Sequence, residues 1–293
     1  PMFGVRTMPK RLLICMLLLQ PLCGLYASQA PLNPTEAARL LQQASFGPTL
    51  SDIQATSQMT AEQWIDWQLR LPATTHADKI NTLPEQKTPV PLSRLETWWR
   101  IALTAPDQLR QRVAFALSEI LVVSDQGNGL NNRVIALANY YDLLLAHSFG
   151  NYRDLMQQVT LSPVMGIYLS HLGNQKADVQ NNIRPDENYA RELMQLFTIG
   201  LYQLNPDGSK KLDDADNPIP TYDQQAIEGF ARVFTGWTSA GTSNFLKPKA
   251  DYLKPMIPFA AYHEPGEKHL LNGVVLPARQ PPPQDLTPAL ALS

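Results

Sequence analysis

The stretch YDQQAIEGFARVFTGW, residues 222–237, shows most directly how this chain folds. Its apolar residues recur at the 3.6-residue period of an α-helix and so fall on one face. They are Ile227, Phe230, Ala231, Phe234 and Trp237. The polar residues just before them, at 221–224, are typical of a helix start. The stretch therefore predicts an amphipathic helix packed against a core.

Comparable helix starts recur on both sides of this stretch. The caps and first-turn prolines predict helices beginning at Asn33-Pro34, Thr60, Ser93, Thr104, Ser162-Pro163 and Pro185, and another over about 133–146. Prolines gather between them, at 84–91, 205–220, 248–258 and 277–288. Strand-like alternation is scarce. We therefore predict an all-α fold, an irregular multi-helix bundle with long Pro-rich connectors and few or no strands.

The first thirty residues have the layout of a secretory signal peptide. Lys10-Arg11 is basic, residues 12–19 are apolar, and small residues follow near 27–30. A buried first helix is the alternative. We expect cleavage near 27–30, export to the periplasm or outside the cell, a helical domain over 31–275 and a Pro-rich tail over 276–293. No later segment approaches the ~20 apolar residues of a transmembrane helix.

Composition excludes several functions. The formal net charge of −2 gives no sign of nucleic-acid binding. Both cysteines, Cys15 and Cys23, lie in the expected leader, where lipid attachment at Cys23 stays open. The exported part would then have no thiol for a disulfide, a nucleophile or a zinc site. Nucleotide-binding and serine-hydrolase motifs are absent, and the cofactor, if there is one, stays unknown.

The densest polar stretch is the predicted helix that begins at Pro185. Glu187, Arg191 and Glu192 project away from its apolar stripe, and Glu187 and Arg191 are spaced as an i,i+4 ion pair. A solvated surface is the simpler interpretation. Glu187 and Glu192 lie about 140° apart around a helix, so a catalytic carboxylate pair needs a partner such as Glu228, with Arg232 beside it. The candidate catalytic residues are Glu187, Arg191, Glu192, Glu228 and Arg232.

A second polar cluster runs over residues 263–269. Its His263, Glu267 and His269 have side chains that can bind a metal ion. Pro265 and Gly266 between them indicate a turn, so solvated side chains are the alternative.

Long strings of this sequence are similar to a known family. They include AARLLQQASFGPT (37–49), LRQRVAFALSEILVVS (109–124), RPDENYARELMQLFTIGL (184–201), YDQQAIEGFARVFTGW (222–237) and HEPGEKHLLNG (263–273). The chain resembles the domain-of-unknown-function family 1800, a group of exported bacterial proteins. The resemblance implies a helical domain. Similar proteins continue with a further helical portion, so this chain looks like a truncated member.

The resemblance leaves the activity open, including whether the protein is an enzyme. Members of the family commonly occur beside exported family 1501 proteins, which resemble sulfatases. This association implies an accessory or assembly partner of a family 1501 protein. The alternative is a carboxylate-dependent hydrolase acting on an extracellular or envelope polymer.

Overall fold

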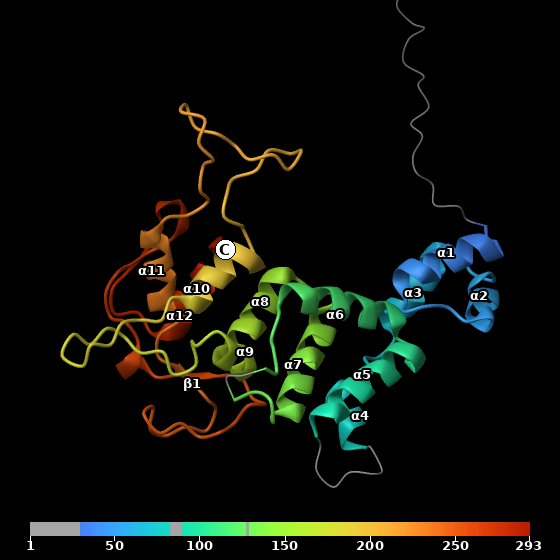
Figure 1. The fold of residues 1–293 in the computed structure, drawn as a ribbon, viewed down its shortest axis with the longest axis horizontal. Helices are drawn as coiled ribbons and strands as arrows, with labels where there is room; N and C mark the ends of the chain where they lie inside the picture. The colour runs from blue at the N-terminus through green and yellow to red at the C-terminus, as the bar shows by residue number, and fades with distance from the viewer. Residues whose placement is uncertain (1–29, 83–89, 127–128) are drawn as a thin grey trace, which may run out of the picture.

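The computed structural model describes residues 30–82, 90–126 and 129–293, and this part of the chain is mostly helical (Figure 1). Its α-helices are α1 (Pro34–Ala44), α2 (Leu50–Thr56), α3 (Ala61–Arg70), α4 (His76–Asn81), α5 (Pro91–Thr104), α6 (Gln108–Ile120), α7 (Val134–His147), α8 (Tyr152–Leu161), α9 (Pro163–Tyr168), α10 (Asn188–Glu192), α11 (Gln224–Val233) and α12 (Pro282–Leu292). A π-helix, η1 (Leu193–Phe197), continues α10. The predicted signal peptide lies outside the described residues, apart from Ala30.

Besides the helices, the described residues form two small antiparallel sheets. Strand β1 (Trp237–Thr238) pairs with β2 (Ile257–Pro258), and β3 (Lys268–His269) pairs with β4 (Val275–Leu276). Short 3₁₀ turns, η2 (Ala260–Tyr262) and η3 (Leu271–Gly273), lie beside them. The mainly helical character is confirmed, but the all-α prediction is not. A strand of two residues is too short for period-2 alternation to appear in a sequence.

The start signals predicted several helices correctly. Asn33 and Thr60 form capping boxes at the starts of α1 and α3, and Asp223 caps α11. The start predicted at Ser93 is wrong, because α5 begins earlier, at Pro91. Proline fits the first helical position since its fixed φ is already helical and its missing N–H is not needed there.

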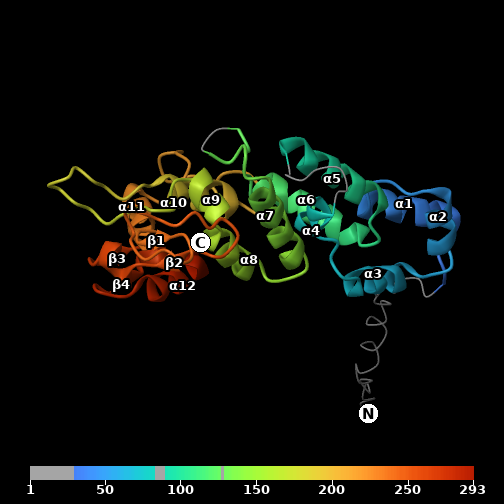
Figure 2. The ribbon, with the colours of Figure 1, turned by 90° about the horizontal axis from the view of Figure 1, so that it is seen from below.

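The molecule is elongated, with its main core toward one end. Figure 2 shows α1, α2 and α3 at one end, and α11, α12, β3 and β4 at the other. Side chains from α6 through α12 form the main core, while a smaller cluster around Leu41 and Trp64 holds α1 to α3. Among the described residues, no helix has the length and apolar character needed to cross a bilayer.

Residues 276–293, predicted as a Pro-rich tail, include α12. Leu286, Ala289 and Leu290 of this helix are buried in the main core. Pro282 stands in its first turn together with Asp285, and both positions favour a helix start. Packing of α12 thus extends the core beyond the domain boundary predicted at residue 275.

A slender arm, residues 202–220, projects from the body between η1 and α11 (Figure 1). Isolated bridges hold it together, pairing Tyr202 with Pro220, Leu204 with Lys210, and Leu212 with Pro218. Hydrogen bonds from these residues go only to other residues of the arm or its base, within the part of the chain that the structure describes. The arm is therefore ordered by its own contacts rather than by packing on the body.

Candidate functional site

Three of the five predicted catalytic residues meet where α10 packs on α11. Arg191 Nη2 donates to Glu187 Oε2 at 2.6 Å and to Gln224 Oε1 at 3.0 Å. Gln224 Nε2 in turn donates to both carboxylates. Because that nitrogen lies 3.3 Å from Glu187 and 3.4 Å from Glu228, the two carboxylates are at most about 7 Å apart. Glu228, named as a possible partner of Glu187, thus lies close to it, and Gln224 links the two.

This α10–α11 cluster faces water. The Arg191 and Glu187 side chains are 45% and 32% exposed, and Glu228 is also exposed. Glu192 and Arg232 contribute no side-chain hydrogen bond to the cluster among the described residues. The ion pair therefore has the geometry of an exposed i,i+4 pair, worth about 0.3–0.5 kcal/mol.

The predicted metal ligands are not brought together. His263 is buried, whereas Glu267 and His269 are exposed on the turn and on β3. Within the described ranges, no group of three or more His, Cys, Asp or Glu side chains is placed to hold a metal ion. His263 binds other partners instead.

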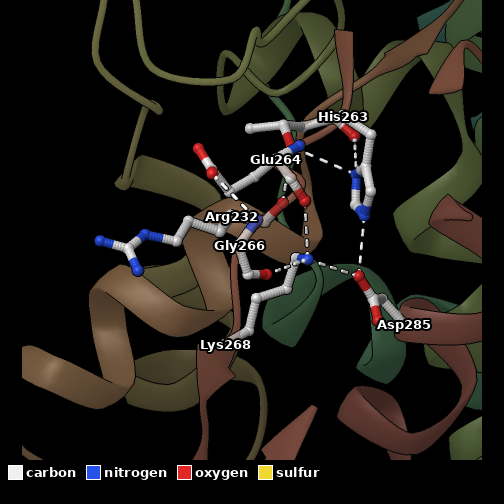
Figure 3. Close-up of polar contacts among 7 residues, drawn as sticks. Arg232, His263, Glu264, Gly266, Lys268 and Asp285 are labelled. Atoms are coloured by element: carbon white, nitrogen blue, oxygen red, sulfur yellow. Dashed lines mark hydrogen bonds and ion pairs between the residues drawn. The ribbon is translucent and has the colours of Figure 1, made fainter. Parts of the chain in front are cut away.

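His263 belongs to a buried polar cluster with Lys268 and Asp285 (Figure 3). Asp285 Oδ2 lies 2.8 Å from His263 Nε2 and 2.8 Å from Lys268 Nζ. Lys268 Nζ also donates to the carbonyl oxygens of Glu264 at 2.7 Å and Gly266 at 3.0 Å. The three side chains are at most 2% exposed. A buried charge needs this kind of pairing, because desolvation otherwise costs several kcal/mol.

Both ring nitrogens of His263 have hydrogen-bond partners. Nδ1 lies 2.8 Å from the Thr235 carbonyl oxygen, which can only accept, so Nδ1 carries a hydrogen. The Thr235 hydroxyl cannot supply that hydrogen, since it donates to the Arg232 carbonyl oxygen at 2.6 Å. On the other side of the ring, Nε2 lies 2.8 Å from Asp285 Oδ2, so the imidazole has a polar partner at each nitrogen.

This His263–Lys268–Asp285 cluster joins separate parts of the chain. Thr235 follows α11, His263 and Lys268 lie on either side of a turn leading into β3, and Asp285 lies in α12. Because none of the three side chains reaches solvent, they cannot contact a substrate in this conformation. We therefore assign the cluster a structural role, that of fastening α12 to β3 and α11.

The sequence contained part of the signal for this cluster. Three prolines before an acidic residue, at 281–285, are typical of a helix start. Lys268 gave no such sign, because a lysine next to Pro265, Gly266 and Glu267 normally belongs to a solvated turn. Lys268 is buried beside Asp285 only because α12 packs against β3.

A second buried histidine supports the same core. His171 Nε2 donates to the Thr160 carbonyl oxygen at 2.8 Å, and the ring stacks on Tyr189 with centroids 4.0 Å apart. Burial lowers the pKa of His171 to about 4, so its ring is neutral near pH 7. The Tyr189 hydroxyl reaches Thr160 Oγ1 at 2.6 Å. These contacts hold α10 against α8 beneath the exposed carboxylates.

Together these features define a class: a mainly helical domain with a buried ionic cluster at one end, an exposed carboxylate surface and a projecting arm. The model of a family described as "Protein of unknown function (DUF1800)" matches residues 39–292. The chain belongs to this family, and the resemblance seen in the sequence is confirmed. Searches of curated proteins and of solved structures found no match.

Proposed function

We propose that this chain is an accessory or assembly protein of the bacterial envelope, which binds an exported protein partner through its projecting arm. The observation that carries the proposal is the exposure of four apolar side chains at the arm and its base. They are Leu201, Tyr202, Leu204 and Leu212. Apolar groups held away from the body of a protein are typical of an interaction surface.

The internal order of the arm supports this role. Asp207 Oδ1 accepts from Ser209 N and Oγ, and Asp213 Oδ1 accepts from the backbone N–H groups of Ala215 and Asn217. These bonds also lower the pKa of Asp207 and Asp213, which keeps both aspartates ionised. A surface already ordered before binding loses less conformational entropy when a partner docks.

The proposed partner is a family 1501 protein, exported and similar to sulfatases. The predicted signal peptide would bring this chain to the same compartment. This choice rests on the association of the two families, and the arm supplies a surface for the contact.

Shortening the arm is expected to weaken partner binding strongly while leaving the fold intact. Gln203 N donates to the Ile219 carbonyl oxygen at 3.0 Å, so a two-residue Asn-Gly turn can replace residues 204–218 between them. We expect affinity for an exported family 1501 protein of the same bacterium to fall by at least ~100-fold, as for loss of a hot-spot region. Titration calorimetry measures this.

The point variant Leu204→Ser/Leu212→Ser separates side-chain recognition from loss of the whole arm. Val179→Ser, on another exposed loop, is its matched control and should bind as the wild type does. Unchanged affinity of the shortened protein would exclude the arm as the binding surface.

The alternative function is a carboxylate-dependent hydrolase, and the close approach of Glu187 and Glu228 favours it. Their separation of at most about 7 Å lies near the range used by glycosidase carboxylate pairs. Glu187→Gln/Glu228→Gln should then reduce hydrolysis of envelope polysaccharide by at least ~100-fold. Glu62→Gln, at an exposed site on α3, is the control. Equal turnover by both variants would end this alternative.

A further inference from the structure

Helix α5 exposes an apolar stripe to solvent. Leu92, Leu95, Trp99 and Leu103 follow one another at spacings of three and four residues, so they lie along one side of the helix. Their exposed fractions run from 52% to 71%. The stripe is about 16 Å long at 1.5 Å per residue.

The side of α5 that packs on the body is partly polar. Its buried residues are Ser93, Thr97, Ile101 and Ala102. Helices on the surface of a globular protein normally turn their larger apolar residues toward the core and their polar ones toward water. Trp98 packs on Phe46 and Phe115, whereas the four residues of the stripe stay outside. A contiguous exposed apolar stripe of this kind is a candidate interaction surface.

A charged pair borders this stripe. Arg100 Nη2 binds Glu96 Oε1 at 2.8 Å, and the two side chains are 62% and 50% exposed. The midpoint of this pair falls at residue 98, and the midpoint of the stripe falls between residues 97 and 98. Half a residue of helix is only ~0.8 Å, so both features share one centre.

A common centre makes the surface complementary to itself. If two copies of α5 pack antiparallel about a two-fold axis at residue 98, the leucines and tryptophans of one stripe cover those of the other. The same axis places Glu96 of each copy opposite Arg100 of its partner, on the same flank. Such an isologous contact is the commonest interface of homodimers.

We propose that two copies of this chain associate through α5, packed antiparallel, with Glu96 and Arg100 paired between copies. Four apolar side chains supply roughly half of the ~800 Å² per partner that a standard interface buries. We therefore expect a reversible dimer with a dissociation constant of roughly 1–100 µM. The arm that we propose for partner binding is a separate element.

The test is a sedimentation-velocity series with the full chain, exported into the periplasm of a bacterial host. The wild type should pass from monomer to dimer as its concentration rises through the micromolar range. Leu103→Glu should weaken the dimer by at least ~100-fold, because it would bury a carboxylate in the apolar stripe. Val179→Glu, outside α5, should associate as the wild type does.

A mixing experiment tests whether the molecule that packs on α5 is a second copy of this chain. Glu96→Lys leaves only positive charge on the flank, and Arg100→Glu leaves only negative charge. Each variant alone should dimerise about tenfold more weakly, since like charges then face each other, and an equimolar mixture should recover the wild-type affinity. A wild type that stays monomeric at ~200 µM would overturn the proposal, and so would a mixture that fails to recover. If a different protein binds α5 and this chain does not self-associate, the mixture would stay monomeric.

Discussion

Replacing Asp285 by alanine is expected to lower the free energy of unfolding by about 3–5 kcal/mol. The substitution leaves the Lys268 ammonium buried with only two carbonyl oxygens as partners, and it removes the acceptor from His263 Nε2. Buried charge without a counterion is among the costliest defects in a folded protein. For a domain of this size, the expected loss lowers the melting temperature by roughly 10 °C. Urea unfolding followed by circular dichroism measures the change.

Two further variants show whether the ion pair itself is responsible. Asp285→Asn keeps an acceptor and the side-chain volume but removes the charge, so it should cost less than Asp285→Ala. Lys268→Met/Asp285→Leu removes both charges and should recover much of the lost stability, because an apolar replacement leaves no uncompensated charge. Limited proteolysis should cut near α12 in Asp285→Ala first. A loss below 1 kcal/mol in Asp285→Ala would contradict the role assigned to the cluster.

Gly229→Ala is expected to destabilise the protein by about 3 kcal/mol or more, although alanine normally favours a helix by about 0.5–1 kcal/mol over glycine. A Cβ at this position of α11 would lie 1.8 Å from the His269 carbonyl oxygen and 2.8 Å from its carbonyl carbon. Both atoms are backbone, so β3 would have to move away from α11. That shift would carry Lys268, the neighbour of His269, out of its position beside Asp285.

Gly150→Ala is the matched control. A Cβ there meets nothing closer than the His147 carbonyl oxygen at 3.5 Å, which is an ordinary contact, and we expect its stability to remain near that of the wild type. Thermal unfolding of both variants gives the comparison. If Gly229→Ala melted within a degree of Gly150→Ala, the close approach of β3 to α11 would not be required for the fold.

Much of the helical framework could be predicted from local sequence. Apolar spacing over residues 222–237 predicted α11, and Ile227, Phe230, Ala231 and Phe234 are all buried. The caps at Asn33 and Thr60 marked two helix starts correctly. Such signals are readable because they depend on neighbours within one or two helical turns.

The candidate site was predicted only in part. The sequence named Glu228 as a possible partner for Glu187 and favoured a solvated surface, and both features are present, but it could not show that Gln224 joins the two carboxylates. Arg232 was predicted to join them, yet among the described residues the hydrogen bonds to the two carboxylates come from Arg191 and Gln224 and none comes from Arg232. Helical spacing gives the direction of a side chain around its own axis, whereas the element it faces is set by packing.

The sequence alone determined the helical periodicity, the caps and the family. Tertiary structure decided which polar residues are buried together and which apolar residues are left in water. His263 and Asp285 are 22 residues apart and meet only because α12 returns to the turn before β3. The apolar stripe of α5 has the spacing of a core-facing helix, yet it is exposed, because burial depends on the surfaces that distant parts of the chain provide.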